Sequence, residues 1–355
     1  MSKDAIYLDY NATSPLRDGV KQVMVDVLGV HGNPSSVHES GREARKLIEE
    51  ARGFVAKSVG VKPVQVIFTS GGTEANNMAL QGKEYGARFC SAIEHDSVVF
   101  SKTKPTPIPV DQNGVIDQSA LTTNNLEESL VSVMLGNNET GVIQPVANIA
   151  ALAKGAGATV HTDAVQAFGK IPLDFESLGV DMMTVSAHKV GGPKGIGALI
   201  VREGMVLTSL LTGGGQERNR RAGTENLAGI VGFGELAKNM DAVLAESSNI
   251  EKLRNKLEAG LGGSTIYSQA AQRLPNTTCV AFPSTIAETQ VLKMDLAGFA
   301  ISAGSACSSG KITPSHVIQA MGFSDEEANQ ALRISLGWGT TQAHIDSFLQ
   351  VWSNS

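Results

Sequence analysis

The sequence predicts an α/β fold with a mostly parallel central sheet, followed by a smaller α+β part. Between about residues 64 and 201, short β-rich runs alternate with helical patterns, and this alternation is typical of parallel sheets whose strands are joined through helices. After about residue 232 the helical runs become longer. We therefore expect a large domain over residues 14–240 and a small domain made of residues 1–13 and 241–355.

The expected elements follow from the hydrophobic patterns. In the large domain, strands are expected over residues 66–69, 89–92, 131–134, 158–161, 183–186 and 198–201, with helices between several of them, such as 74–82 and 146–154. In the small domain, helices are expected over 235–246, 251–261, 289–296, 315–321, 325–331 and at the C-terminus, and strands over 277–282, 299–302 and 332–336. Parallel sheets bind ligands beyond the carboxyl ends of their strands, so residues there are the first candidates for function.

Composition and charge exclude several classes of function. The 355 residues carry a formal net charge of only -6, and without a long block of lysine and arginine a nucleic-acid partner is not expected. No apolar stretch reaches the length that spans a membrane, and the N-terminus lacks the pattern of a secretory signal. The chain has three cysteines, a small and odd number that does not suit a disulfide scaffold. This usage favours the cytoplasm.

Lys189 is the first candidate for chemistry, because it stands between an expected strand and the glycine-rich turn 190–197. A lysine amine in a partly desolvated pocket loses its proton more easily, so it can attack a carbonyl and form a Schiff base. This placement favours pyridoxal phosphate (PLP) as the cofactor. A lone lysine at a strand end is more commonly a surface residue, so the interpretation depends on the other motifs.

A glycine-rich turn, Ser-Gly-Gly-Thr-Glu at residues 70–74, follows the expected strand 66–69 and opens a helix. Glycines let the backbone approach a ligand closely, and the free N–H groups at a helix start bind phosphate. An ordinary turn before a helix would have the same composition.

Asp163 and Gln166 follow another expected strand, 158–161. A buried carboxylate there could pair with the pyridinium nitrogen of PLP and keep it protonated, which makes the ring an electron sink. Gln166 could form a hydrogen bond with the ring hydroxyl. The alternative is that Asp163 only caps a helix.

His95 lies beyond the expected strand 89–92. It could stack on a cofactor ring and move protons, although a histidine at such a place is more commonly a polar loop residue.

Cys307 lies in a run of small residues, 301–310, which has little to pack and is expected to be mobile. A thiol in such a run is a candidate nucleophile, with an inert turn residue as the alternative. Cys90 and Cys279 lie inside apolar runs and are expected to pack as small hydrophobic residues. Arg333, in the expected strand 332–336, could grip a substrate carboxylate through two parallel hydrogen bonds, or form an ordinary ion pair.

Several motifs in the same order along the chain resemble those of the cysteine desulfurases, PLP enzymes of aminotransferase class V with the type I fold. They are Tyr-Leu-Asp-Tyr-Asn-Ala-Thr at 7–13, Gly-Asn-Pro-Ser-Ser-Val-His at 32–38, residues 69–77, Asn-Asn-Glu-Thr-Gly at 137–141, Ser-Ala-His-Lys at 186–189, residues 215–218 and 223–226, and Gly-Ser-Ala-Cys at 304–307. The resemblance covers nearly the whole chain.

The resemblance implies a role for each candidate residue. Around the cofactor, it implies that Lys189 holds PLP, Asp163 the ring nitrogen, Gln166 the ring oxygen and His95 the ring face, with the phosphate held by Gly72, Thr73, Ser186 and His188. Thr224 would reach the phosphate of the neighbouring subunit's cofactor, which implies a homodimer. Around the substrate, Asn138 and Arg333 would hold the carboxylate of L-cysteine, and Cys307 would receive its sulfur as a persulfide while L-alanine is released.

The sulfur acceptor is left open by the same resemblance. Residues 305–322 resemble the longer-loop subgroup that serves iron–sulfur assembly and nitrogenase or tRNA thiolation pathways, so an iron–sulfur scaffold is one expected partner. The chain stops at Ser355 without the extension that some members use for docking a scaffold, and Gly-Trp-Gly at 337–339 replaces an expected Gly-Arg-Phe. The alternatives are a selenocysteine lyase, another class V PLP enzyme on this fold, or a non-catalytic partner protein.

Overall fold

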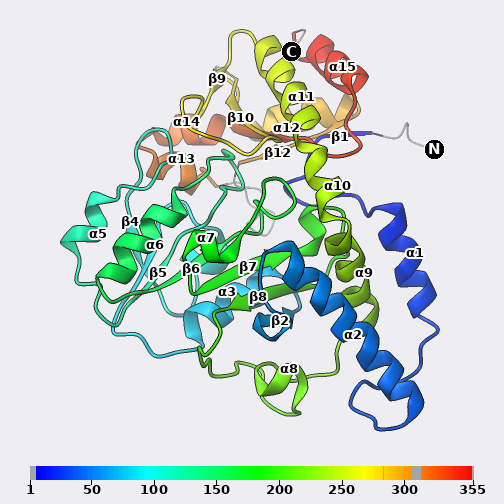
Figure 1. The fold of residues 1–355 in the computed structure, drawn as a ribbon. Helices are drawn as coiled ribbons and strands as arrows, with labels where there is room; N and C mark the ends of the chain where they lie inside the picture. The colour runs from blue at the N-terminus through cyan, green and yellow to red at the C-terminus, as the bar shows by residue number, and fades with distance from the viewer. Residues whose placement is uncertain (1–4, 283, 305–312, 354–355) are drawn as a thin grey trace.

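A seven-stranded sheet forms the centre of the computed structural model, which describes residues 5–282, 284–304 and 313–353. The strand order is β2 (Val66–Thr69), β8 (Gly197–Val201), β7 (Met182–Ser186), β6 (Thr159–Asp163), β5 (Leu130–Ser132), β3 (Arg88–Ser91) and β4 (Thr106–Ile108) (Figure 1). Only β8 runs antiparallel to its two neighbours, and the remaining pairs are parallel. The predicted α/β class with a mostly parallel sheet is therefore confirmed.

The edge strand β4 is the one strand of this sheet that the sequence did not predict. It contains Pro107 and is flanked by Pro105 and Pro109, and proline normally argues against a strand because it has no N–H to donate to the ladder. At the edge of a sheet this cost is avoided, because one side of the strand needs no partner.

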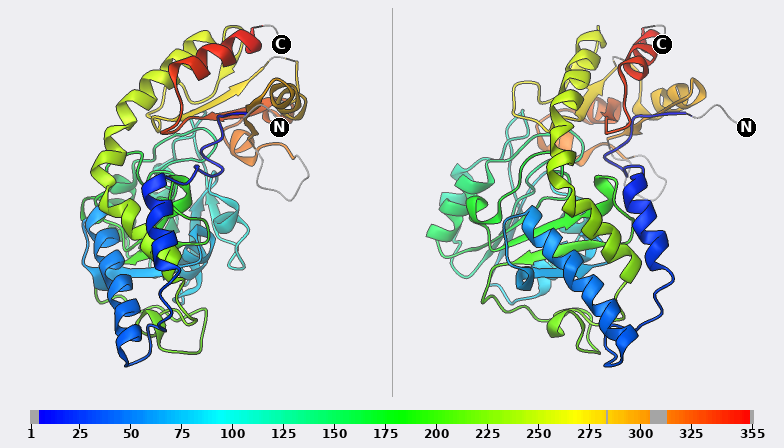
Figure 2. Two further views of the ribbon diagram at one scale, coloured as in Figure 1. Left: turned by 90° about the vertical axis from the view of Figure 1, so that its right-hand side faces the viewer. Right: turned by 45° about the vertical axis from the view of Figure 1, so that its right-hand side comes forward.

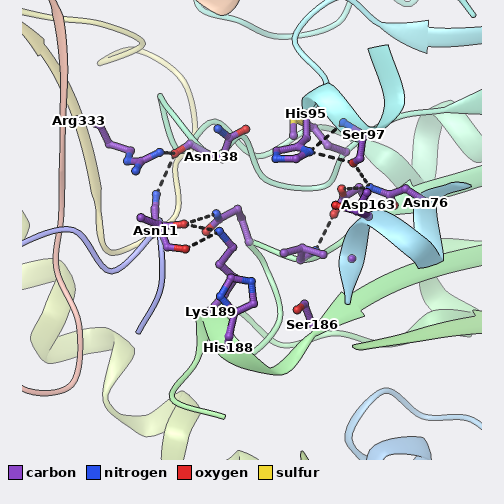
Figure 3. A pocket seen from close by; sticks show the side chains of 16 residues that line it. Asn11, Asn76, His95, Ser97, Asn138, Asp163, Ser186, His188, Lys189 and Arg333 are labelled. Carbon is purple, nitrogen blue, oxygen red and sulfur yellow. Dashed lines mark hydrogen bonds between the residues drawn. The ribbon is translucent and has the colours of Figure 1, made fainter. Parts of the chain in front are cut away.

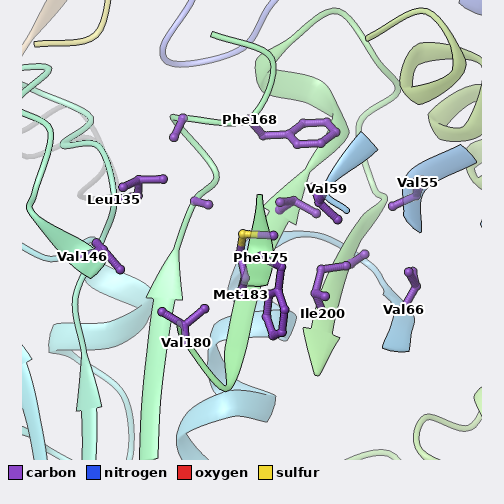
Figure 4. Packing of buried hydrophobic residues seen from close by; sticks show 14 of the residues in the cluster. Val55, Val59, Val66, Leu135, Val146, Phe168, Phe175, Val180, Met183 and Ile200 are labelled. Atoms are coloured by element: carbon purple, nitrogen blue, oxygen red, sulfur yellow. The ribbon is translucent and has the colours of Figure 1, made fainter. Parts of the chain in front are cut away.

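Helices cover both faces of the central sheet, so its strands are buried on both sides. On one face, α2 (Glu39–Ser58) packs on α9 (Leu227–Lys238), which also contacts α1 (Asp18–Val27) (Figure 2). The cluster beneath this face includes Phe175, Met183 and Ile200 (Figure 4). On the other face, α3 (Gly72–Gln81) contacts β7 and β8. Successive residues of one strand, such as Leu199 and Ile200, therefore pack into the different hydrophobic clusters on the two faces of the sheet.

The remaining helices of the first part are short, apart from α6. They are η1 (Pro63–Gln65), α4 (Asp96–Val99), α5 (Ser119–Thr123), α6 (Val146–Gly155), α7 (Phe175–Leu178), η2 (Ala187–Lys189), α8 (Gln216–Asn219) and α10 (Met240–Ala245). Within the described residues, no helix has the length and apolar character needed to cross a membrane.

A second sheet is built from the C-terminal part of the chain. It is antiparallel, in the order β12 (Ser302–Ala303), β13 (Ala331–Ser335), β10 (Thr277–Ala281) and β9 (Thr265–Ile266). Its helices are α11 (Ser247–Gly260), α12 (Ala287–Leu296), α13 (His316–Ala320), α14 (Asp325–Gln330) and α15 (Gln342–Trp352). The N-terminal strand β1 (Ile6–Tyr7) pairs in parallel with β11 (Phe299–Ala300), so the N-terminal segment completes this part as expected. The boundaries at residues 13 and 240 stay a proposal.

The two parts contact each other at Gly-Trp-Gly 337–339, where the sequence departs from the expected Gly-Arg-Phe. The Trp338 ring lies 5.5 Å from the guanidinium carbon of Arg17, and Arg17 also forms a two-bond ion pair with Glu246. Gly337 allows the turn to pack closely against Tyr10, because a Cβ atom at that position would lie 1.9 Å from the ring of Tyr10. The Gly-Trp-Gly sequence therefore forms a close contact between the N-terminal segment and the turn after β13.

Candidate active site

Residues from the carboxyl ends of the parallel strands surround a cavity of about 270 Å³. Figure 3 shows Arg333 and Asn11 on one side and His95, Asp163 and Asn76 on the other, with Lys189 between them. The cavity is lined by Asn11, Ala12, Gly72, Thr73, Asn76, His95, Ser97, Met134, Asn138, Asp163, Val165, Gln166, Ser186, His188, Lys189 and Arg333. Of the predicted site residues that the structure describes, it therefore brings together all but Thr224.

Lys189 reaches the cavity from the short helix η2, which follows β7 directly. Its Nζ donates to the backbone oxygens of Asn11, at 2.7 Å, and Ala12, at 2.9 Å. These contacts fix a half-buried amine at the floor of the cavity.

Asp163 ends β6 and is only 5% exposed. Its Oδ2 accepts a 2.6 Å bond from the Asn76 side-chain nitrogen, and its Oδ1 accepts the backbone N–H of Val165 at 2.9 Å. Two donors on a buried carboxylate fix its orientation. A carboxylate held in this way fits the ring nitrogen of PLP.

His95 is the N-cap residue of α4. Its Nδ1 accepts the backbone N–H of Ser97 at 3.0 Å, so a neutral ring carries its proton on Nε2. Burial lowers the pKa of His95, an effect that the nearby Asp163 opposes and Lys189 reinforces. The imidazole at the cavity wall is therefore neutral near neutral pH.

The start of α3 lies on the same cavity. Gly71 has a φ of 153°, a conformation that glycine tolerates far better than other residues. A Cβ atom on Gly72 would lie 2.9 Å from a methyl group of Val165, so this turn requires glycine at both positions. The positive end of the helix dipole at Gly72 and Thr73 suits a phosphate group.

His188 and Ser186 lie next to this helix start. The Nδ1 of His188 pairs with the Thr13 hydroxyl at 3.2 Å. Burial, together with the charges of Lys189 and Lys194, lowers the pKa of His188 to about 4. His188 is therefore a neutral hydrogen-bonding group at neutral pH.

Arg333, in the middle of the second sheet, is 2% exposed. Its Nη2 pairs with Asp9 at 2.8 Å, and its Nη1 donates to the backbone oxygen of Asn138 at 3.3 Å. Its Nε has no hydrogen-bond partner among the described residues. A buried donor without a partner is costly, and a ligand carboxylate in the cavity would relieve that cost.

Three residues that sequence reasoning gave no role connect the site. Asn76 orients Asp163, and it lies one helical turn after Gly72, a spacing that could have revealed it. The backbone oxygen of Asn11 accepts a hydrogen bond from Lys189 Nζ. Lys170 donates to Gln166, four positions before it, and to Asn11; the contact with Asn11 joins parts of the chain 159 positions apart and leaves no local pattern.

Two predicted residues are not among those that line this cavity in the part of the chain that the structure describes. Thr224 is exposed and precedes α9, so its predicted contact with a partner subunit's cofactor stays a prediction. Cys307 lies outside the described residues. The other two cysteines, Cys90 and Cys279, are buried as predicted, and burial raises the pKa of both thiols. Among the described residues, no three His, Cys, Asp or Glu side chains are grouped to hold a metal ion.

Comparison with known proteins identifies the class to which this fold and site belong. The model of the Aminotransferase class-V family matches residues 6–348, so the chain belongs to that family. The class V and NifS-like proteins are PLP enzymes, and PLP is therefore the cofactor of this protein.

The relatives narrow this class further. The chain is 40% identical to "Cysteine desulfurase IscS" of Dictyoglomus turgidum, over 98% of this chain and 94% of that protein. It is 39% identical to "Putative cysteine desulfurase IscS 1" of Bacillus subtilis, over 96% of both chains. The NifS-like protein of Rickettsia africae has the same fold, with a TM-score of 0.92, 36% identity and 99% of both chains covered.

Proposed function

We propose that this protein is a cysteine desulfurase, which converts L-cysteine into L-alanine and keeps the sulfur atom as a persulfide on Cys307. The observation that carries the proposal is the convergence of Lys189, Asp163 and Arg333 on one cavity (Figure 3). An amine for a cofactor aldehyde, a carboxylate for its ring nitrogen and a guanidinium for an amino-acid carboxylate are the groups that this reaction needs.

The lining residues hold the cofactor by its different groups. Lys189 would hold the aldehyde carbon, Asp163 the ring nitrogen and Gln166 the ring oxygen. The helix start at Gly72 and Thr73, with Ser186 and His188, would hold the phosphate. His95 would hold the ring through its face. When bound, PLP supplies an electron sink for the electron pair left at the substrate Cα.

With its amine free, Lys189 would be the base that removes the substrate Cα proton. The backbone oxygens of Asn11 and Ala12 accept hydrogen bonds from its Nζ and can guide the amine back to one position between steps. The neutral His95, with its proton on Nε2 and its Nδ1 bonded to Ser97, can donate a hydrogen bond from Nε2 at the cavity wall.

Arg333 and Asn138 orient the substrate carboxylate. Asp9 fixes the guanidinium from the side of the second sheet through the 2.8 Å ion pair. The Nε of Arg333, which has no partner among the described residues, is then available to one carboxylate oxygen. A grip on a carboxylate suits an amino acid as the substrate class.

The segment that carries Cys307 begins beside Arg333. Ser302 is the register partner of Arg333 in the second sheet, and Cys307 follows Ser302 by five positions, so an extended chain could reach about 17 Å from there. Beyond the segment, Ser315 donates to Glu139 and His316 pairs with the backbone oxygen of Glu94. Glu94 precedes His95, which lines the cavity. The anchoring of the segment therefore supports a reach of Cys307 into the site.

Transfer of the substrate sulfur to Cys307 conserves atoms and electrons. The Cys307 thiolate attacks the substrate sulfur, so that an S–S bond forms while the C–S bond breaks. The carbon that loses the sulfur takes up a proton, which gives L-alanine. The resulting persulfide is a reversible modification and can be passed to an acceptor.

The same proposal includes the partners and the compartment. The exposed Thr224 contacts the phosphate in the site of a second subunit, so the protein works as a homodimer. An iron–sulfur scaffold or another thiolation protein accepts the sulfur. The two described cysteines are both free thiols, which suits a reducing cytoplasm.

The test is alanine formation from L-cysteine with matched variants. The purified protein should bind PLP, show the absorbance of the covalently held cofactor and form alanine. Lys189→Ala should lose the absorbance band and the activity, whereas Cys307→Ala should keep the band and lose sulfide release under reductant. A wild-type protein that stays colourless with added PLP would refute the proposal, and full sulfide release by Cys307→Ala would refute the persulfide step.

A further inference from the structure

Lys170 is a buried lysine that the proposed chemistry does not use. It is 8% exposed, and its Nζ lies 2.7 Å from Asn11 Oδ1 and 2.7 Å from Gln166 Oε1. Burial lowers the pKa of Lys170 well below its usual value, and the positive charges of Lys189 and Arg333 lower it further. A neutral amine has two hydrogens, and these two side-chain oxygens can accept both.

The contacts with Lys170 and with the backbone oxygen of Asn11 together fix which way the Gln166 amide points. An amide carries an acceptor oxygen and a nitrogen with two hydrogens, and Lys170 can supply hydrogens to the oxygen. With Oε1 turned toward Lys170, Nε2 donates one hydrogen to the backbone oxygen of Asn11 at 3.0 Å. The second Nε2 hydrogen is then available on the cavity side, which Gln166 lines.

Asn11 extends the same network to the catalytic lysine. Its backbone oxygen accepts from both Gln166 and Lys189. Its side-chain oxygen accepts from Lys170 and from Asn276. Lys170 is not among the residues that line the cavity, yet it lies one hydrogen-bonded residue from two groups at the cavity wall.

We propose that Lys170 is a positioning residue that fixes the Gln166 amide with its N–H, and not its C=O, toward the ring oxygen of PLP. The inference rests on the proposed cofactor placement and adds a specific function to a lysine outside the cavity. An N–H donor stabilises negative charge on the ring oxygen. A carbonyl in its place would repel that charge.

The experiment is a pH titration of the cofactor absorbance in the PLP-loaded protein. The proton that titrates on the bound cofactor is stabilised by negative charge on the ring oxygen. Removing the Gln166 N–H donor leaves more of that charge to hold the proton, so the midpoint pH of the titration rises. We expect Lys170→Met to raise this midpoint by about one pH unit, the size of one hydrogen bond to a charged group. Gln166→Leu should raise it by a similar amount. The double variant should rise no further than Gln166→Leu alone, because Lys170 acts through Gln166.

Two further variants separate positioning from packing. Lys154→Met is the matched control, because Lys154 pairs with Asp181 and does not line the cavity, and its midpoint should equal that of wild type. Lys170→Gln keeps two N–H hydrogens and should keep a midpoint closer to wild type than to Gln166→Leu. If Lys170→Met does not fold, the comparison of Lys170→Gln with Gln166→Leu carries the test, and equal midpoints would contradict the proposal.

An unchanged midpoint in folded, loaded Lys170→Met would overturn the inference, as would full additivity in the double variant. A wild-type protein that binds no PLP would instead count against the proposed function. The two failures are therefore distinguishable.

Discussion

The substrate grip proposed for Arg333 can be tested by replacing it with methionine, which keeps much of the length and removes the charge. The guanidinium is fixed by Asp9 at 2.8 Å and by the backbone oxygen of Asn138 at 3.3 Å. If it donates two bonds to the substrate carboxylate at about 2 kcal/mol each, the loss is about 4 kcal/mol. At 1.4 kcal/mol per tenfold, kcat/KM for L-cysteine should fall by nearly a thousandfold.

The assay measures alanine formation over a range of L-cysteine concentrations in PLP-loaded protein. Asp9→Asn is the control, because it keeps the Arg333 cation and weakens only its support. We expect a smaller fall in kcat/KM for this variant, of about tenfold. If folded Arg333→Met retained kcat/KM within about threefold of wild type, the assigned carboxylate site would be wrong.

Two other predictions concern buried polar residues in and below the site. Asn76→Ala removes the 2.6 Å bond to Asp163 and should weaken PLP affinity by about thirtyfold, or 2 kcal/mol. Absorbance titration with PLP measures this affinity. The control is Asn77→Ala, a half-buried neighbour that bonds to Thr73 and Gln81 of its own helix and does not line the cavity, so the affinity should stay unchanged; equal losses in both variants would contradict the role of Asn76. His161 has its pKa lowered to about 3 by burial, so below pH 6.5 the unfolded chain binds a proton that the folded protein does not. The free energy of unfolding should therefore fall with decreasing pH, by about 2 kcal/mol between pH 7 and pH 5 from this group alone. Urea unfolding at both pH values should give a fall that is smaller by this amount in His161→Gln, and an identical fall in the two proteins would refute it.

The central sheet could be predicted because its strands are buried on both faces and appear in the sequence as short apolar runs. Residues directly after those runs, such as Asp163 and Lys189, could then be assigned to one edge of the sheet by topology alone. The edge strand β4 was missed because its prolines indicate a break in a strand, an indication that holds in the interior of a sheet but not at its edge.

The supporting residues could not be predicted from local pattern. Asp9 and Arg333 are separated by 324 positions, and Lys170 and Asn11 by 159, so only the folded chain shows that each pair is in contact. Lys170 also follows Gln166 by four positions, which places the two on one side of a turn of helix, but a lysine at that spacing is usually a surface residue. Only the burial of Lys170 in the folded chain distinguishes it from a surface lysine.

The most direct test of the central claim is mass spectrometry of the PLP-loaded protein after brief exposure to L-cysteine, without reductant. We predict a mass gain of one sulfur atom, located on the peptide that contains Cys307 and absent from Lys189→Ala. Alanine formation with no added sulfur on Cys307, or with the sulfur on Cys90 or Cys279, would contradict the assignment of Cys307 as the sulfur acceptor.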